Sequence, residues 1–331
     1  MTKPIRWGVL GASKFAREHM GPAIHAAHGA EFAALATSDR SKADGFLAFC
    51  PGLTVHGSYE ALLADPSIDA VYIPLPNHLH VEWTLKALAA GKHVLCEKPI
   101  ALNAAEIDAI IAARDASGLL AAEAYMILHH PQWQRARQLV QDGAIGTLSH
   151  VDGAFTYDNR ADTGNIRNQA AMGGGGIRDI GVYTYGSTRF VTGAEPVSLQ
   201  SRMILENGVD TWAQVTGIMA GPGGRFTYSA ITSMRLFPRQ EMVFQGDKGL
   251  IRLTAPFNPR VFGEAQLELH RAGQTTVIER FSAVNHYQLQ VTAFGNSIRT
   301  GAPYACPLEF SQGTQAMMDS VFDQAEIITL A

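Results

Sequence analysis

Short apolar runs alternate with helix-like stretches through the first third of the chain. The apolar runs predict strands, at residues 5–10, 32–37, 70–73, 93–96 and 119–122. The stretches between them predict helices, at residues 14–28, 41–49, 59–63, 81–90 and 104–116. Strands separated by helices of this length are typical of right-handed βαβ units in a doubly wound parallel sheet.

The pattern changes after about residue 124, where many runs alternate apolar and polar side chains. These runs predict strands, at residues 150–156, 197–205, 211–219, 226–234, 241–245, 250–253 and 266–270. Turn sequences such as Asn207-Gly208 separate them, which favours an antiparallel sheet with one face covered. Two further helices are predicted, at residues 287–299 and 312–327.

These elements predict an α/β protein of two domains, and 331 residues are enough to build both cores. Residues 1–123 are predicted to form a doubly wound Rossmann domain that binds a dinucleotide. Residues 124–331 are predicted to form an α+β domain with a large open, mainly antiparallel sheet, which serves substrate binding and oligomerisation. Such a sheet leaves a face or edges to be covered, so we expect a homodimer or homotetramer.

Composition argues against several kinds of partner and location. A hydrophobic fraction of 47% and a charged fraction of 17% are typical of a folded enzyme. The net charge of -4 argues against nucleic acid or an anionic membrane, and no apolar run approaches the roughly 18 residues of a membrane span. The sequence starts without a signal-peptide core, and its three scattered cysteines suit a reducing compartment. We therefore expect a cytoplasmic protein whose substrate is a small molecule.

A glycine-containing turn follows the first predicted strand. Gly11 and Ala16 fit the first and third places of the fingerprint G-x-G-x-x-G/A, while Ser13 holds the second. Free N–H groups at a helix start favour an anion, so the turn predicts a pyrophosphate site that includes Lys14 and Phe15. The Ser13 hydroxyl is able to bond a phosphate, although its Cβ crowds the approach. A tight turn without a ligand is the alternative interpretation.

The segment after the second predicted strand bears on the choice of cofactor. NAD enzymes place a carboxylate there for the ribose diol, whereas NADP enzymes use hydroxyls and cations for the extra phosphate. Ser38, Arg40 and Lys42 predict a phosphate site, and Asp39 is interpreted as a helix N-cap. We therefore expect NADP rather than NAD. In the alternative interpretation Arg40 and Lys42 form a solvated face, and Asp39 binds the ribose of NAD.

Several motifs occur far apart in the chain. They are I-P-L-P-N-H-L-H at 73–80, G-K-H-V-L-C-E-K-P at 91–99, E-A-Y-M at 123–126, H-P-Q at 130–132, G-G-G-G-I-R-D-I-G-V-Y at 173–183, R-F at 189–190 and G-A-E-P at 193–196. In this order they resemble the glucose–fructose oxidoreductase / inositol dehydrogenase (Gfo/Idh/MocA) family, and within it the sugar and dihydrodiol dehydrogenase branch. The resemblance spans most of the chain.

The resemblance implies a set of site residues. It implies that Lys98 of the E-K-P motif lies beside the nicotinamide. Tyr183 is the alternative acid or base, since the branch has a tyrosine at this place, and it is expected to converge with Lys98 from the other domain. Four residues of the two loop motifs are implied to line the cofactor cleft: Pro76, Asn77, His80 and Glu97.

Oxidation of an alcohol needs a group that takes the hydroxyl proton. A positive nicotinamide disfavours the charged form of a nearby lysine, so we expect the pKa of Lys98 to fall toward a useful range. Asp179 and Tyr183 are four residues apart and share one face if their segment is helical, where Asp179 would orient the substrate or Lys98. A surface lysine, a core tyrosine and a capping aspartate are the alternatives. The four glycines before Asp179 predict either a close backbone approach or a flexible loop.

The chain departs from the family pattern in two places. Leu128 stands where the branch usually has an arginine, and Arg178 stands at a place that is usually apolar. His130 and Arg167 are candidate substrate contacts, with solvated side chains as the alternative. No helical HxxxH or HExxH spacing is present, so we expect no metal site.

The predicted function is an NAD(P)-dependent oxidoreductase that moves a hydride between the nicotinamide and a sugar, polyol or related cyclic hydroxyl or carbonyl. Within this class the resemblance leaves open a trans-dihydrodiol dehydrogenase, or a sugar–sugar oxidoreductase that retains its cofactor. Two other classes also stay open: a non-catalytic dinucleotide-binding regulator on the same fold, and a metal-dependent lyase acting on sugars.

Overall fold

The computed structural model describes residues 3–273 and 275–329, which form two compact units. The first unit comprises the chain up to His129 together with Asn285–Gln312, and the second comprises His130–Val284 and the chain from Gly313 onward. The predicted division at residues 123/124 assigns 285–312 to the second domain, whereas the structure assigns them to the first. Residues 1, 2, 330 and 331, which the predicted domain limits include, lie outside the described residues.

The first unit contains a six-stranded sheet in which every pair of neighbouring strands is parallel. Its order is β3-β2-β1-β4-β5-β6, the strand order of dinucleotide-binding folds. The strands are β1 (Ile5–Leu10), β2 (Ala30–Ala36), β3 (Thr54–His56), β4 (Ala70–Ile73), β5 (His93–Cys96) and β6 (Ala121–Glu123). The predicted Rossmann fold is confirmed. The short strand β3 was not predicted, because three residues show no periodicity.

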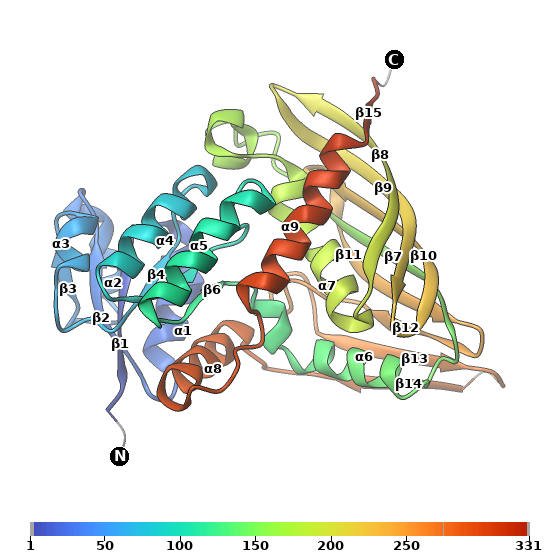
Figure 1. The fold of residues 1–331 in the computed structure, drawn as a ribbon, viewed down its shortest axis with the longest axis horizontal. Helices are drawn as coiled ribbons and strands as arrows, with labels where there is room; N and C mark the ends of the chain where they lie inside the picture. The colour runs from blue at the N-terminus through green and yellow to red at the C-terminus, as the bar shows by residue number, and fades with distance from the viewer. Residues whose placement is uncertain (1–2, 274, 330–331) are drawn as a thin grey trace. The chain divides into compact units, whose positions relative to one another are not determined.

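Helices cover this sheet in two groups, as Figure 1 shows: α4 packs on α5, and α1 packs on α8. The helices are α1 (Gly21–Ala26), α2 (Asp44–Leu47), α3 (Tyr59–Leu63), α4 (His80–Ala89), α5 (Ala104–Ser117) and α8 (His286–Thr300). The chain becomes helical at Lys14 and passes through a π-helical stretch, Ala16–Met20, before α1. Helix α8 comes from the far end of the sequence and contacts β2 as well as α1.

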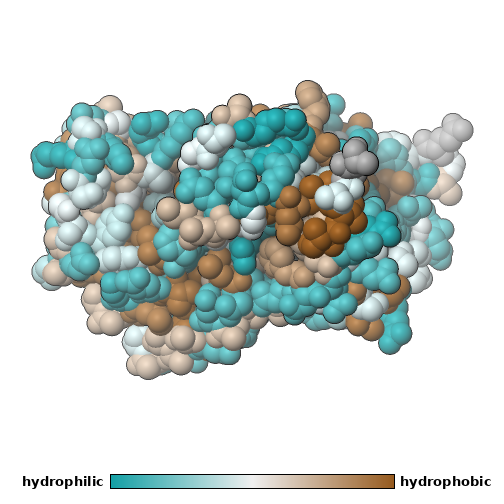
Figure 2. Space-filling model, turned by 90° about the horizontal axis from the view of Figure 1, so that it is seen from above, coloured by the Kyte–Doolittle hydropathy of each residue, from teal (hydrophilic) through white to brown (hydrophobic). Residues whose placement is uncertain are grey.

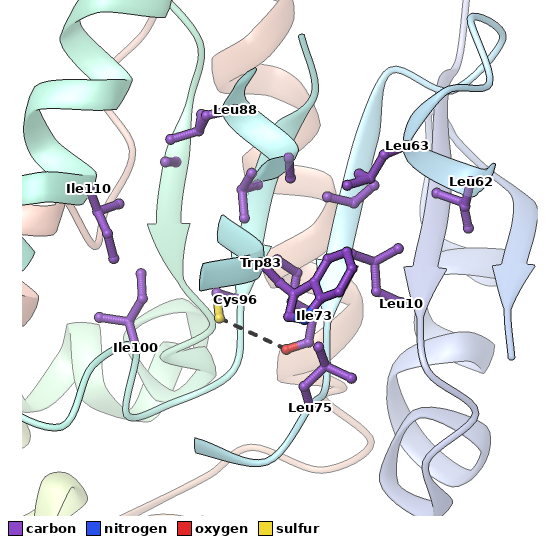
Figure 3. Packing of buried hydrophobic residues seen from close by; sticks show 14 of the residues in the cluster. Leu10, Leu62, Leu63, Ile73, Leu75, Trp83, Leu88, Cys96, Ile100 and Ile110 are labelled. Carbon is purple, nitrogen blue, oxygen red and sulfur yellow. Dashed lines mark hydrogen bonds between the residues drawn. The ribbon is translucent and has the colours of Figure 1, made fainter. Parts of the chain in front are cut away.

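The core of the first unit lies between the sheet and helices α3, α4 and α5, and Figure 3 shows part of it. Leu10, Ile73 and Cys96 come from three strands, and Trp83 of α4 packs among them. The Cys96 thiol donates to the Ile73 carbonyl at 4.0 Å. Every residue of β4 is buried. This agrees with the continuous apolar runs in the sequence, because a parallel sheet is covered on both faces.

The second unit contains a nine-stranded sheet of order β14-β13-β12-β11-β7-β10-β9-β8-β15. Its strands are β7 (Leu148–Asp158), β8 (Glu195–Glu206), β9 (Val209–Gly221), β10 (Gly224–Ser233), β11 (Arg235–Gly246), β12 (Gly249–Leu253), β13 (Gln266–Arg271), β14 (Thr275–Arg280) and β15 (Ala325–Ile327). Two pairs are parallel, β7 with β10 and β8 with β15, and the other pairs are antiparallel. The predicted large, mainly antiparallel sheet is confirmed.

Helices α6 (Pro131–Gln141) and α7 (Val182–Thr192) pack on each other, and they contact β13 and β7 respectively. Helix α9 (Leu308–Asp323) is attached to this sheet by the Ser201 hydroxyl of β8, which donates to the Val321 carbonyl. The predicted helix at 312–327 is wrong at its end, because residues 325–327 form β15 and pair with β8. Pairing with β8 therefore makes residues 325–327 a strand rather than the end of a helix.

The sheet keeps large apolar side chains in contact with solvent. These are Val197 and Leu205 on β8, Leu236 and Phe237 on β11, Val277 and Ile278 on β14, and Ile327 on β15. In the space-filling view, hydrophilic side chains cover most of the visible face, and one dense cluster of apolar side chains stands out in brown (Figure 2). None of the described helices combines the length and apolar character needed to cross a membrane.

Candidate active site

Gly11 turns the chain from β1 toward the first helix. Its φ is +110°, and a Cβ at this position would lie 3.1 Å from the Leu75 side chain. The Gly11 N–H donates to the carbonyl of Ala36 at the end of β2, at 3.0 Å. A residue with a side chain would be strained here, so the first glycine of the fingerprint is explained by local geometry.

Ser13 caps the helix that follows this turn. Its hydroxyl accepts the N–H of Ala16 at 3.1 Å, and its carbonyl accepts the N–H of Arg17. A hydroxyl that accepts this bond keeps its own hydrogen to donate, so the cap is compatible with the predicted phosphate contact of Ser13. The N–H groups of Lys14 and Phe15 lie in the first helical turn, where no carbonyl of the same helix accepts them. These two groups, together with the helix dipole, fit the anionic pyrophosphate of a dinucleotide.

Asp39 caps the short 3-10 helix Arg40–Ala43, as the sequence predicts. Its carboxylate accepts the N–H of Ser41 at 3.1 Å and the Ser41 hydroxyl at 2.6 Å, and these bonds lower the pKa of Asp39. Ser38, Arg40 and Lys42 are exposed around it. The segment presents a hydroxyl and two cations, which fit a phosphate, and both bonds to Ser41 end on the same Asp39 oxygen, Oδ1.

His80 connects the two loop motifs of the first unit. It is fully buried, and its two ring nitrogens lie 2.8 Å from the Leu75 carbonyl and 2.7 Å from the Pro99 carbonyl. Burial lowers the pKa of His80, while its bonds to these two carbonyls act to raise it. Pro76 and Asn77 are partly exposed in the same loop. His80 itself has no exposed surface for a cofactor, and we assign it the role of holding the loops.

Two carboxyl groups lie close to Lys98 at the ends of β5 and β6: Glu97, which is partly buried, and Glu123, which is buried. The Tyr72 hydroxyl donates to Glu97, whose second oxygen accepts the Lys98 N–H at 3.3 Å. Glu123, at the end of β6, accepts the N–H of Ile100 at 2.9 Å. Burial raises the pKa of both Glu97 and Glu123, while the positive charge of Lys98 acts against this rise. Tyr72 stands in no motif, and Glu123 belongs to the E-A-Y-M motif without being predicted to lie near Lys98, because only strand pairing brings both to the E-K-P motif.

In the second unit, Asp179 is held by two side chains. Its carboxylate accepts the Tyr157 hydroxyl at 2.7 Å and forms an ion pair with the Arg167 guanidinium at 2.8 Å. Burial and the Asp179 charge raise the pKa of Tyr157, and the same charge raises the pKa of Arg167. Arg167, a predicted substrate contact, thus contacts a predicted catalytic residue. Tyr157 was missed, because nothing in its local sequence marks it.

Tyr183 lies one turn after Asp179 on the same helix. A π-helical stretch, Ile177–Gly181, leads into α7, so both residues lie on a continuous helix as the sequence anticipated. π-Helical turns of this kind are frequent at functional sites. The Tyr183 ring is 5% exposed and packs against Phe155 and Phe257, with ring centroids 5.8 and 5.6 Å away. These aromatic contacts restrict the ring and leave a small part of it accessible.

The remaining candidates lie in less accessible places. His130 is fully buried and caps α6, where its Nδ1 accepts the N–H of Gln132 at 3.2 Å, and burial lowers its pKa to about 4. Leu128 is fully buried as well. Arg178 places its guanidinium over the Phe322 ring, 4.9 Å from the centroid. No cluster of three or more metal-ligating side chains was found among the residues that the structure describes.

The parallel sheet with its glycine turn defines a dinucleotide-binding protein, and comparisons with known proteins give its family. Residues 5–125 match the model described as "Oxidoreductase family, NAD-binding Rossmann fold", and residues 133–252 match the GFO/IDH/MocA C-terminal domain. The chain belongs to the GFO/IDH/MocA family and is an NAD(P)-dependent oxidoreductase. The family, the fold and the enzyme class predicted from the motifs are confirmed.

Two curated relatives match nearly the whole chain. A dTDP-3,4-didehydro-2,6-dideoxy-alpha-D-glucose 3-reductase of Saccharopolyspora spinosa is 34% identical and covers 96% of this chain and 95% of its own. A D-xylose 1-dehydrogenase (NADP(+)) of Haloferax volcanii is 31% identical, over 97% and 98%. Both are enzymes, which favours an enzyme over a non-catalytic regulator.

Solved structures match equally well. A 3-ketoreductase from Actinomadura kijaniata in complex with NADP and TDP-benzene has a TM-score of 0.88 at 28% identity, covering 99% of this chain and 100% of that one. Similar structures include variants of that enzyme in which a lysine is replaced by alanine or glutamate, or a tyrosine by phenylalanine.

Proposed function

We propose that this protein is an NADP-dependent dehydrogenase or reductase acting on a pyranose, polyol or similar hydroxylated ring, with Lys98, Tyr183 and Asp179 as its catalytic residues. The observation that carries this proposal is the Asp179 carboxylate, which Tyr157 and Arg167 hold on the same helix as Tyr183. Holding one carboxylate with two side chains, one turn before Tyr183, is more than a structural helix requires.

Bound NADP supplies or accepts the hydride, and the chain supplies the proton chemistry. In the oxidative direction Lys98 hydrogen-bonds the substrate oxygen and relays its proton as the hydride leaves the adjacent carbon. Tyr183 is the alternative donor or acceptor for this proton. Asp179 stays ionised beside Arg167 and orients the substrate or the lysine. The reductive direction uses the same groups in reverse.

The choice of NADP rests on the segment after β2. Ser38, Arg40 and Lys42 are exposed, while Asp39 caps the 3-10 helix. Two relatives also favour NADP, since one is named as an NADP(+) enzyme and another was solved with NADP.

The two curated relatives act on a nucleotide-linked keto sugar and on xylose, which supports a sugar-like substrate here. A trans-dihydrodiol substrate, or a cofactor that cycles between two sugars, stays within the proposal.

The experiment that tests this proposal has two parts. In a thermal-shift measurement, NADP is expected to raise the melting temperature more than NAD at equal concentration, because a ligand that binds only the native state stabilises it. Absorbance of reduced nicotinamide is then followed with a panel of aldoses, polyols and keto sugars. Tight cofactor binding without turnover on any of them would contradict the enzymatic proposal and favour a sensor. A larger shift with NAD would move Asp39 to the ribose and contradict the role of Arg40.

We also propose a homodimer or homotetramer formed through the open sheet. Val197, Leu205 and Ile327 are exposed on the neighbouring strands β8 and β15, and β15 is an edge of the sheet, where unpaired backbone groups favour a covering partner. Sedimentation velocity is expected to show one species heavier than the 35.7 kDa chain. A monomer across the micromolar range would contradict this oligomer.

We propose a cytoplasmic location for the protein. Its three cysteines are free and buried, which suits a reducing compartment.

A further inference from the structure

The helix that carries Asp179 and Tyr183 starts at a buried carboxyl group from a distant strand. Asp210 of β9 is 3% exposed, and its Oδ2 accepts the N–H of Ile177 at 2.7 Å. We propose that Asp210 is a positioning residue, which fixes the start of this helix and thereby holds Asp179 and Tyr183 in place for the reaction. The inference rests on the proposed function, because it assumes that these two residues take part in catalysis.

The first N–H groups of a helix have no acceptor within it, and the helix N-terminus favours a negative charge. Asp210, which is 33 residues away in sequence, supplies an acceptor for one of these N–H groups. Burial raises the pKa of Asp210 to about 7, whereas the N–H groups of Ile177 and Gly176 and the charge of Arg178 act to lower it. The N–H groups at the helix start therefore favour the ionised form of Asp210, and burial opposes it.

Two of the four consecutive glycines, Gly175 and Gly176, are explained by this contact. Gly175 has a φ of +115°, and a Cβ there would lie 2.2 Å from the Asp210 Oδ1. A Cβ on Gly176 would lie 3.2 Å from the Asp210 Oδ2. Glycine is needed at 175 on both grounds, since the φ is strained for other residues and the side chain would displace the carboxylate. The sequence alternative of a flexible loop does not describe this segment.

The same glycines connect Asp210 to the Asp179 cluster. The N–H of Gly175 donates to the Arg167 carbonyl at 2.9 Å, and the N–H of Asp179 donates to the Gly175 carbonyl at 3.1 Å. The Arg167 side chain in turn pairs with the Asp179 carboxylate. Asp210 thus contacts the helix start, and the helix start contacts both Arg167 and Asp179. A shift of Asp210 is therefore expected to move both partners of the ion pair.

The first test replaces Asp210 by asparagine, which keeps the volume but turns one acceptor into a donor. A displacement of about 1 Å at a reacting group costs up to about a hundredfold in rate, so kcat is expected to fall about ten- to a hundredfold. The KM and Kd for NADP are expected to stay unchanged, because the candidate cofactor residues lie in the first unit. Ser201→Ala is the control for stability alone. It also removes a buried hydrogen bond in the second unit, and it is expected to lower the melting temperature without lowering kcat.

A second variant approaches the same contact from the glycine side. Gly175→Ala is expected to lower kcat as Asp210→Asn does, since the added Cβ displaces the carboxylate. Gly224→Ala is the matched control, because Gly224 also has a positive φ, +101°, whereas a Cβ there meets nothing within 4 Å; it is expected to leave kcat unchanged. If Asp210→Asn does not fold, Gly175→Ala carries the test.

The two proposals fail in different ways. If Tyr183→Phe and Asp179→Asn leave kcat unchanged, the proposed catalytic residues are wrong. If those variants lower kcat but Asp210→Asn and Gly175→Ala change only the melting temperature, the positioning role of Asp210 is wrong. The double variant Asp210→Asn/Tyr183→Phe is expected to lose less than the product of the two single losses, because the residues act through one helix. Full multiplicativity would also contradict the inference.

Discussion

Lys98→Met is expected to lower kcat by about 10²- to 10⁴-fold, the range that positioned acid–base groups contribute, while NADP still binds. Methionine keeps the length and apolar character of the lysine stem but has no proton to relay. The carboxyl groups of Glu97 and Glu123 also lose their nearby cation, so the fold is expected to lose some stability. Steady-state kinetics on an active sugar gives kcat, and fluorescence of bound NADPH gives the Kd.

Lys86→Met is the matched control for this variant. Lys86 lies on α4 of the same unit, is exposed and pairs with Glu82 four residues earlier. Its loss removes a positive charge and a surface ion pair worth well under about 1 kcal/mol. We expect kcat to stay within about twofold of the parent protein. A Lys98→Met enzyme with near-normal kcat, or one that no longer binds NADPH, would contradict the proposed role of Lys98.

The double variant Arg40→Ala/Lys42→Ala is expected to weaken NADP binding by about a hundredfold or more and to leave NAD binding unchanged. Each charge-assisted hydrogen bond contributes about 1.5–3 kcal/mol, and losing two such contacts is enough for this change. Isothermal titration with each cofactor measures both affinities. The loss is expected to shrink as salt concentration rises, because exposed charges are screened.

Arg225→Ala/Lys248→Ala controls for net charge, since it removes two exposed cations from the second unit. It is expected to leave the NADP affinity unchanged. Equal losses of NAD and NADP affinity in Arg40→Ala/Lys42→Ala would show that the segment supports the fold rather than the phosphate. No loss for either cofactor would mean that both cations are only a solvated face.

The sequence predicts the nucleotide-binding unit well, because its chemistry is local. A buried parallel strand is a continuous apolar run, so most strands of the first sheet were located to within a few residues. The N-cap role of Asp39 follows from residues directly beside it. The sequence also predicts that the second sheet is large and mainly antiparallel. It predicts a helix where β15 lies, because only pairing with β8 makes that segment a strand.

The parts of the site that sequence analysis missed depend on contacts between distant segments. Tyr157 reaches Asp179 from β7, and Asp210 reaches Ile177 from β9. Neither residue stands in a recognisable pattern. His80 was noticed in its motif, but its task was not, because both of its carbonyl partners become neighbours only in the folded loops. A sequence motif therefore locates a functional region but does not give the structural role of each residue in it.

The return of residues 285–312 to the first unit limits how this protein can be dissected. Helix α8 packs on α1, and its Phe294 ring lies 5.3 Å from the ring of Trp7, which is fully buried in β1. A fragment cut after residue 129 would lose this cover and expose the indole, so aggregation is the expected outcome of expressing it alone. A self-standing NADP-binding fragment would need α8 spliced back through a short linker.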